Sequence, residues 1–183
     1  MSYKRWLFIA AGLFLLGMLL GLFMPATVSS MLTRDQLEML RGLGQVLQPF
    51  TITMALFVFF KNVTALIFSF VFSPFLLLFP IIALTLNGWF LSFVAVSVVQ
   101  ETSLGFLIAG ILPHGIFEIP AIVIGEAAAL SFGSFAIMCL FSKEKRVKFV
   151  PHLKQNLKYL LLAAAFLLPA AIIETYITPL FLT

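Results

Sequence analysis

The stretch from Pro49 to Val99 holds about fifty residues, and Lys61 is the single charged side chain among them. About 20 apolar residues in a helix are enough to cross the hydrocarbon layer of a bilayer. The stretch therefore predicts two membrane-spanning helices. Because the residue before a proline tends to leave the helical region, we expect the turn at Ser73–Pro74, with Pro80 as the alternative break. The second of these helices would then run from about Phe75 to Val98.

The composition of the whole chain leads to the same class of protein. Of its 183 residues, 62% are hydrophobic and 10% are charged, and the mean hydropathy is +1.16. Soluble domains have about a quarter of their residues charged, so a soluble domain of this composition would lack the polar side chains to cover its surface. We therefore expect an all-α, polytopic bundle of transmembrane helices in the cell membrane, with residues 1–183 forming one domain surrounded by lipid.

Two more spans are expected at the ends of the chain. The first runs from about Trp6 to Met24 and the last from about Leu157 to Tyr176. The N-terminal segment is similar to a signal peptide, but no small-residue cleavage site follows it, so we expect an uncleaved span. Its Gly17 and Gly21 form a GxxxG pattern, which lets another helix approach closely. Residues 30–47 combine helically spaced leucines with balanced charges and predict a helix on the outer membrane surface.

The apolar run from Ser103 to Phe141 is difficult to divide into spans. About 39 residues would form a helix of about 58 Å, against an apolar layer of about 30 Å. One straight span is too short to use the run, and two full spans would leave no residues for a turn. We expect a half-helix from Leu104 to Leu112, a break at Pro113, and a long tilted span from there to Phe141. The total is about five spans.

The basic residues predict the orientation in the membrane. Six of the eleven lie in one short stretch: Lys143, Lys145, Arg146, Lys148, Lys154 and Lys158. With Lys4 and Arg5 they would lie on one side of the membrane, against Arg34 and Arg41 on the other. Because cytoplasmic loops are rich in lysine and arginine, we expect the N-terminus inside and the C-terminus outside. The charge is explained by topology, so we expect no nucleic acid partner.

Ionisable side chains within the apolar segments are the candidates for a functional site. They are Lys61, His114, Glu118, Glu126 and Glu174. Such residues are costly in a membrane, face the protein interior, and mark ion or substrate pathways. The alternative is structural: buried, hydrogen-bonded groups that fix how the helices pack.

The segment 113–120 (PHGIFEIP) holds the densest group of these side chains. His114 and Glu118 are four residues apart and share one face of a helix. Counting helical rise from the membrane surface places both in the outer half, where Glu174 also falls. Lys61 and Glu126 fall nearer the middle, and we expect them to form an inner ion pair.

Three functions would use such groups. Carboxylates and an imidazole can relay ions or protons, which predicts a channel or transporter. Buried charges can instead specify the packing of a scaffold. The third alternative is an intramembrane metal-dependent enzyme, with His114 and Glu118 as the ligands. The sequence has two histidines, no HExxH motif, and one cysteine, Cys139, so neither an enzyme, a catalytic residue nor a cofactor is expected.

Several motifs resemble those of the stage II sporulation protein M family of membrane proteins. The segment 112–121 (LPHGIFEIPA) is the most specific; Asn62, Asn87–Gly88 and the segment 173–179 (IETYITP) follow the same order. The resemblance covers roughly Thr51 to Pro179.

This resemblance adds Asn62 and Asn87 to the polar site formed by His114, Glu118 and Glu174. Members used in sporulation act as scaffolds that hold peptidoglycan-degrading partners at the membrane. The resemblance therefore implies a membrane scaffold with protein partners, and we also expect a homo-oligomer. Lys61 and Glu126 depart from the family's pattern, so the resemblance does not support the inner ion pair.

Overall fold

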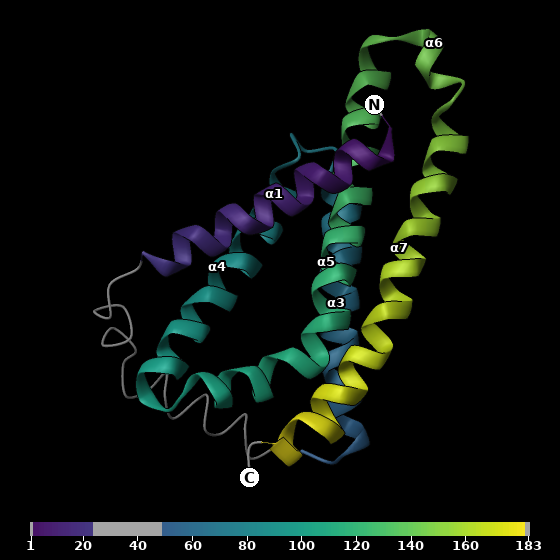
Figure 1. Ribbon diagram of the computed structural model, residues 1–183. Helices are drawn as coiled ribbons and strands as arrows, with labels where there is room; N and C mark the ends of the chain where they lie inside the picture. Colours follow the sequence, from purple (N-terminus) through teal and green to yellow (C-terminus); the bar gives the residue numbers. More distant parts are fainter. Residues whose placement is uncertain (1, 24–48, 182–183) are drawn as a thin grey trace, which may run out of the picture.

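The computed structural model describes residues 2–23 and 49–181, and every regular element in these ranges is a helix (Figure 1). The elements are α1 (Tyr3–Leu22), α3 (Ile52–Phe72), α4 (Leu78–Glu101), α5 (Leu104–Phe141), α6 (Lys143–Arg146), α7 (Phe149–Ile172), the π-helix η2 (Ile173–Ile177) and the 3₁₀-helix η3 (Thr178–Phe181). The surface helix expected near residues 30–47 lies outside the described residues.

Five helical segments of the described ranges are long and apolar enough to cross a membrane, as predicted. They are α1, α3, α4, α5 and the continuous run Phe149–Phe181. The turn expected at Ser73–Pro74 is confirmed, because α3 ends at Phe72 and α4 begins at Leu78. Pro80 lies in the first turn of α4, where its missing N–H has no helical partner to lose.

The centre of the bundle is α5. Every residue from Gly125 to Gly133 is buried, which requires neighbours on all sides of the helix. Figure 1 shows α5 between α4 on one side and α7 on the other, and it packs against α1 and α3 as well. The alanines and glycines of this segment let the neighbouring helices approach closely.

Apolar side chains fill both sides of α5. Against α1 and α4 the buried cluster is Ala10, Phe14, Leu84, Ala127 and Leu130. Against α3 and α7 it is Leu66, Ala121, Ala163 and Leu167. Each cluster thus combines an alanine of α5 with larger side chains of its neighbours, Phe14 and Leu84 on one side and Leu66 and Leu167 on the other, which allows close packing.

The predicted break at Pro113 is corrected by the structure. Residues 104–112 do not form a separate half-helix, because α5 runs without interruption for 38 residues. The helix is nevertheless bent: Figure 1 shows its first turns running across the base of the view before the rest turns upward beside α3. Pro113 and Pro120 lie inside the helix, and each removes a backbone hydrogen bond, the usual cause of a sharp bend. His114 and Glu118 lie at this bend.

The helices α1 and α4 cross with their backbones in contact. A Cβ atom added at Gly17 would overlap the backbone carbonyl oxygen of Thr85, and one added at Gly88 would overlap that of Phe14. Gly21 faces the backbone of Trp89 in the same way. The GxxxG pattern is therefore used within the chain, against α4.

The N-terminus lies near α6 at one end of the bundle, and the C-terminus lies at the opposite end (Figure 1). At the α6 end, Arg146 donates from Nε to the carbonyl oxygen of Cys139 (2.8 Å) and from Nη2 to that of Leu140 (3.0 Å). These carbonyls belong to the last turn of α5, where no helical N–H is available. A basic side chain thus closes the C-terminus of the central helix.

Candidate functional site

A cavity of about 370 Å³ lies between the helices on the C-terminal side of the bundle's centre. Its polar lining is Lys61, Asn62, Asn87, His114, Glu118 and Glu174. Apolar residues of α1, α4 and α5, among them Phe14, Phe90 and Ile122, make the remaining wall. The structure therefore places around one cavity all the predicted site residues except Glu126.

His114 and Glu118 reach the cavity from the bend in α5. They are half-buried, and His114 Nε2 lies 3.9 Å from Glu118 Oε2. The expected shared helix face is observed. This separation is longer than a hydrogen bond, so the two atoms face a common space without being bonded to each other.

A second residue orients each of these side chains. Asn62 on α3 donates from Nδ2 to Glu118 Oε1 at 3.1 Å. His114 Nδ1 lies 3.2 Å from the hydroxyl oxygen of Thr178 on η3. The atoms left toward the cavity are therefore Nε2 of the imidazole and Oε2 of the carboxylate.

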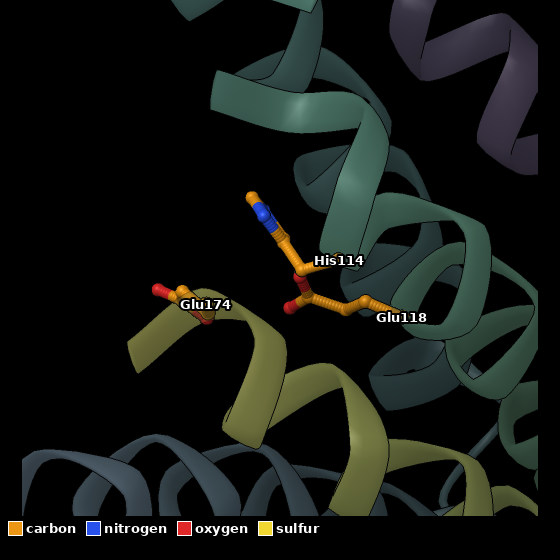
Figure 2. Close-up of side chains that lie close together, drawn as sticks. All are labelled: His114, Glu118 and Glu174. Atoms are coloured by element: carbon orange, nitrogen blue, oxygen red, sulfur yellow. The ribbon is translucent and has the colours of Figure 1, made fainter. Parts of the chain in front are cut away.

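Glu174 comes from the π-helix η2, which directly continues α7. Short π-helical turns are rare and occur often at functional sites. One ligand atom each from His114, Glu118 and Glu174 can be chosen so that all lie within 4.8 Å of one another. Figure 2 shows the three side chains between α5 and the C-terminal segment. Glu174 also interacts electrostatically with Glu118 and with Lys61.

The expected ion pair between Lys61 and Glu126 is absent from the ion pairs of the described residues. Glu126 is 2% exposed, and its Oε2 accepts a hydrogen bond from Ser69 on α3. Lys61 precedes Ser69 by eight residues, about 12 Å along a helix axis. Lys61 therefore lies at the level of the cavity, whereas Glu126 lies deeper in the bundle.

Asn87 lines the cavity from α4 but is held by its own helix. Its Nδ2 donates to the carbonyl oxygen of Ala83 at 2.7 Å. The amide oxygen is thus the atom of Asn87 that can serve a ligand, because an amide carries both donor and acceptor groups.

Sequence reasoning did not identify Thr178 as part of the site. The available signal was its position four residues after Glu174 in the segment IETYITP, a spacing that often places two residues on one face. The second histidine of the sequence, His152, lies away from this site, within α7. There its Nε2 lies 3.2 Å from the carbonyl oxygen of Ser131, and its ring stacks on Phe135.

The cavity as a whole suits a cationic or polar guest. Two carboxylates, one imidazole and two amides supply acceptor atoms, and Lys61 supplies one positive charge. Buried carboxylates in low-dielectric surroundings need a compensating charge. The site therefore has the chemistry to bind a cation. That cation could take the place of the Lys61 ammonium group beside the carboxylates.

Comparison with known proteins gives the family. The model of the stage II sporulation protein M family matches residues 10–179. An uncharacterized protein of Methanocaldococcus jannaschii is 28% identical over 122 residues, which is 64% of this chain and 52% of the relative. A second one from the same organism is 37% identical over 76 residues, 42% of this chain and 43% of the relative.

The chain spans about half the length of these curated relatives. No solved structure matches it. The family match covers most of the sequence, and it includes the segments that carry His114, Glu118 and Glu174. The chain therefore belongs to the stage II sporulation protein M family.

Proposed function

We propose that this multi-pass membrane protein binds a small charged solute in the cavity and moves it across the membrane. The observation that carries the proposal is the gathering of six polar side chains, from four helical elements, around one cavity between membrane spans. Ionisable groups among transmembrane helices are costly and are typical of ion and substrate pathways. A site that served packing alone would be filled by its own side chains.

Backbone irregularity beside the cavity supports the same function. The bend in α5 and the π-helix η2 meet where His114 and Glu174 lie. Non-helical or distorted backbone at membrane depth is tolerated where it is enclosed by protein or lines a cavity. Many transporters place their binding sites where the regular helical backbone is disturbed.

The orientation is part of this proposal. Lys4, Arg5 and the basic residues of α6 lie at the end of the bundle that holds the N-terminus (Figure 1). By the positive-inside rule this end faces the cytoplasm and the C-terminus faces outward. The cavity then lies in the outer half, so a solute would enter from outside.

A flux assay in proteoliposomes tests the transport function. We expect flux of protons or of metal cations above that of protein-free vesicles, and loss of most of it in Glu118→Gln and Glu174→Gln. Glu126→Gln is the matched control, because it changes a buried carboxylate of α5 that does not line the cavity. Absence of flux in the wild type, or flux as high as that of the wild type in both cavity variants, would contradict the proposal.

A membrane scaffold, with the chain as a homo-oligomer that holds partner proteins, is the second candidate. It is supported by family membership over residues 10–179. A scaffold needs the folded bundle but not the charges of the cavity. Complementation of a deletion strain separates the two: if Glu118→Gln and Glu174→Gln restore growth and morphology as the wild type does, the scaffold is favoured over transport.

A further inference from the structure

Potential ligand atoms of three side chains lie close together at the cavity, as the ligands of a metal ion do. A ring nitrogen of His114, a carboxylate oxygen of Glu118 and one of Glu174 lie within 4.8 Å of one another. The ligands of a tetrahedral zinc ion lie about 3.3 Å apart, at metal–ligand distances of about 2.0–2.1 Å. Small side-chain rotations would close the difference, and the pair at 3.9 Å is already near it.

The supporting hydrogen bonds are an independent observation that points to a ligand. Histidines that bind metals generally use their second ring nitrogen in a hydrogen bond, which fixes the ring and its tautomer. Thr178 occupies Nδ1 of His114, and Asn62 occupies Oε1 of Glu118. In each case the atom left free is the one that faces the other side chain.

The charges select a divalent ion. A bound ion would face the two carboxyl groups of Glu118 and Glu174, and Lys61 is an electrostatic neighbour of Glu174. A divalent cation neutralises both carboxylates, whereas the single charge of Lys61 neutralises one. Lys61 has an exposed side chain and can withdraw when the ion enters.

The ligand set selects the kind of divalent ion. One imidazole with two carboxylates suits borderline transition metals such as Zn²⁺ and Mn²⁺. Calcium prefers six to eight oxygen ligands, more than the three residues provide. Imidazole is a poor ligand for calcium and magnesium, so His114 favours the transition metals.

We propose that His114, Glu118 and Glu174 bind one divalent transition-metal ion, with Asn62 and Thr178 holding two of the ligands in position. The inference rests on the proposed function in taking the cavity as an ion-binding site, and it names the class of ion. Each of the three ligands contributes one atom. Solvent or Asn87, which also faces the cavity, completes the coordination.

Metal titration of the purified full-length protein in detergent tests this inference. After treatment with a chelator, calorimetry with Zn²⁺ and with Mn²⁺ should show saturable binding, and elemental analysis should give about one ion per chain. We expect His114→Ala, Glu118→Gln and Glu174→Gln each to weaken binding about 10-fold or more. Asn62→Ala should weaken it about 10-fold, the usual effect of losing a residue that orients a ligand.

Two variants serve as controls for nonspecific binding. His152→Ala removes the other histidine of the chain, and Glu126→Gln removes the buried carboxylate outside the cavity; both should bind as the wild type does. Lys61→Met should bind severalfold more tightly, because it removes the competing positive charge. Lys61 is exposed, so this variant remains informative if a ligand variant fails to fold.

The binding and flux experiments fail in distinguishable ways. Absence of saturable binding of both ions, or unchanged affinity in folded Glu118→Gln and Glu174→Gln variants, would overturn the metal site. Binding without flux would keep the metal site and overturn transport. Proton flux in the absence of any metal binding would keep transport and overturn the metal site.

Discussion

Asn62 on α3 and Glu118 on α5 are joined by a hydrogen bond of 3.1 Å from Nδ2 to Oε1. The bond links two membrane spans at the level of the cavity. Hydrogen bonds between transmembrane helices contribute about 0.6 kcal/mol on average and up to about 1.7 kcal/mol. We expect Asn62→Ala and Glu118→Ala to show a coupling of this size in a double-mutant cycle, measured by unfolding in mixed micelles.

The matched control uses Asn87, which lines the same cavity but bonds to its own helix. Asn87→Ala and Glu118→Ala should be additive within about 0.5 kcal/mol. If the Asn62 cycle were additive to the same degree, the hydrogen bond would make no net contribution.

The crossing of α1 and α4 gives a second prediction. At Gly17 and Gly88 an added Cβ would meet backbone atoms of the other helix, which cannot rotate away as a side chain can. The helices must then separate. We expect Gly17→Ala and Gly88→Ala each to destabilise the bundle by about 1–3 kcal/mol, the usual range for an overpacked contact.

Gly12, on the same helix, is the control because nothing lies within 4 Å of a Cβ added there. Alanine is a better helix former than glycine, so Gly12→Ala should be neutral or stabilise the protein by up to about 1 kcal/mol. Thermal unfolding of all three variants in one detergent gives the comparison. Equal effects at Gly12 and Gly17 would mean that helix propensity, not contact, decides the result.

Hydropathy predicted the transmembrane class and the number of spans because both depend on local composition. The turn at Ser73–Pro74 followed from a local rule for the residue before proline, and the structure confirms it. The shape of α5 did not follow. A proline inside a long helix can break it or bend it, and the packing of neighbouring helices decides which. Here the surrounding spans keep the hydrogen-bonded helix continuous through Pro113.

The part of the candidate site that depends on helix periodicity was predicted from the sequence. His114 and Glu118 share a face because four residues make about one turn, and Glu174 was placed at the same depth by counting residues. Predicting whether Lys61 pairs with Glu126 requires the position of α3 relative to α5 along their axes. Helix periodicity does not give this relative position, because it is set by tertiary contacts such as that of Ser69 with Glu126.

The relative position of α3 and α5 can be tested by double-mutant cycles. Ser69→Ala and Glu126→Gln should be coupled, because they remove the two partners of one buried hydrogen bond. Lys61→Met and Glu126→Gln should be additive within about 0.5 kcal/mol, since the two groups lie at different depths. Free energies of unfolding for the single and double variants test both statements. A coupling between Lys61 and Glu126 larger than that between Ser69 and Glu126 would contradict the helix alignment.

The orientation in the membrane gives the final prediction. Cys139 is 7% exposed and is the single cysteine, so Cys139→Ala provides a background for labelling. Glu144→Cys places a thiol in the exposed α6, and Thr102→Cys places one between α4 and α5. Figure 1 shows α6 and the junction between α4 and α5 at opposite ends of the bundle. Because basic loops stay in the cytoplasm, a membrane-impermeant maleimide should label Thr102→Cys in intact cells and Glu144→Cys in inverted vesicles alone.

The unmodified protein, with its buried Cys139, should remain unlabelled in both preparations and serves as the control for labelling that does not depend on the introduced thiols. The reverse pattern, with Glu144→Cys labelled in intact cells and Thr102→Cys protected, would place the basic end outside. The cavity would then lie in the half of the bundle nearer the cytoplasm. In that case the direction of solute entry proposed from the positions of His114, Glu118 and Glu174 would be reversed, while their arrangement as a binding site would stand.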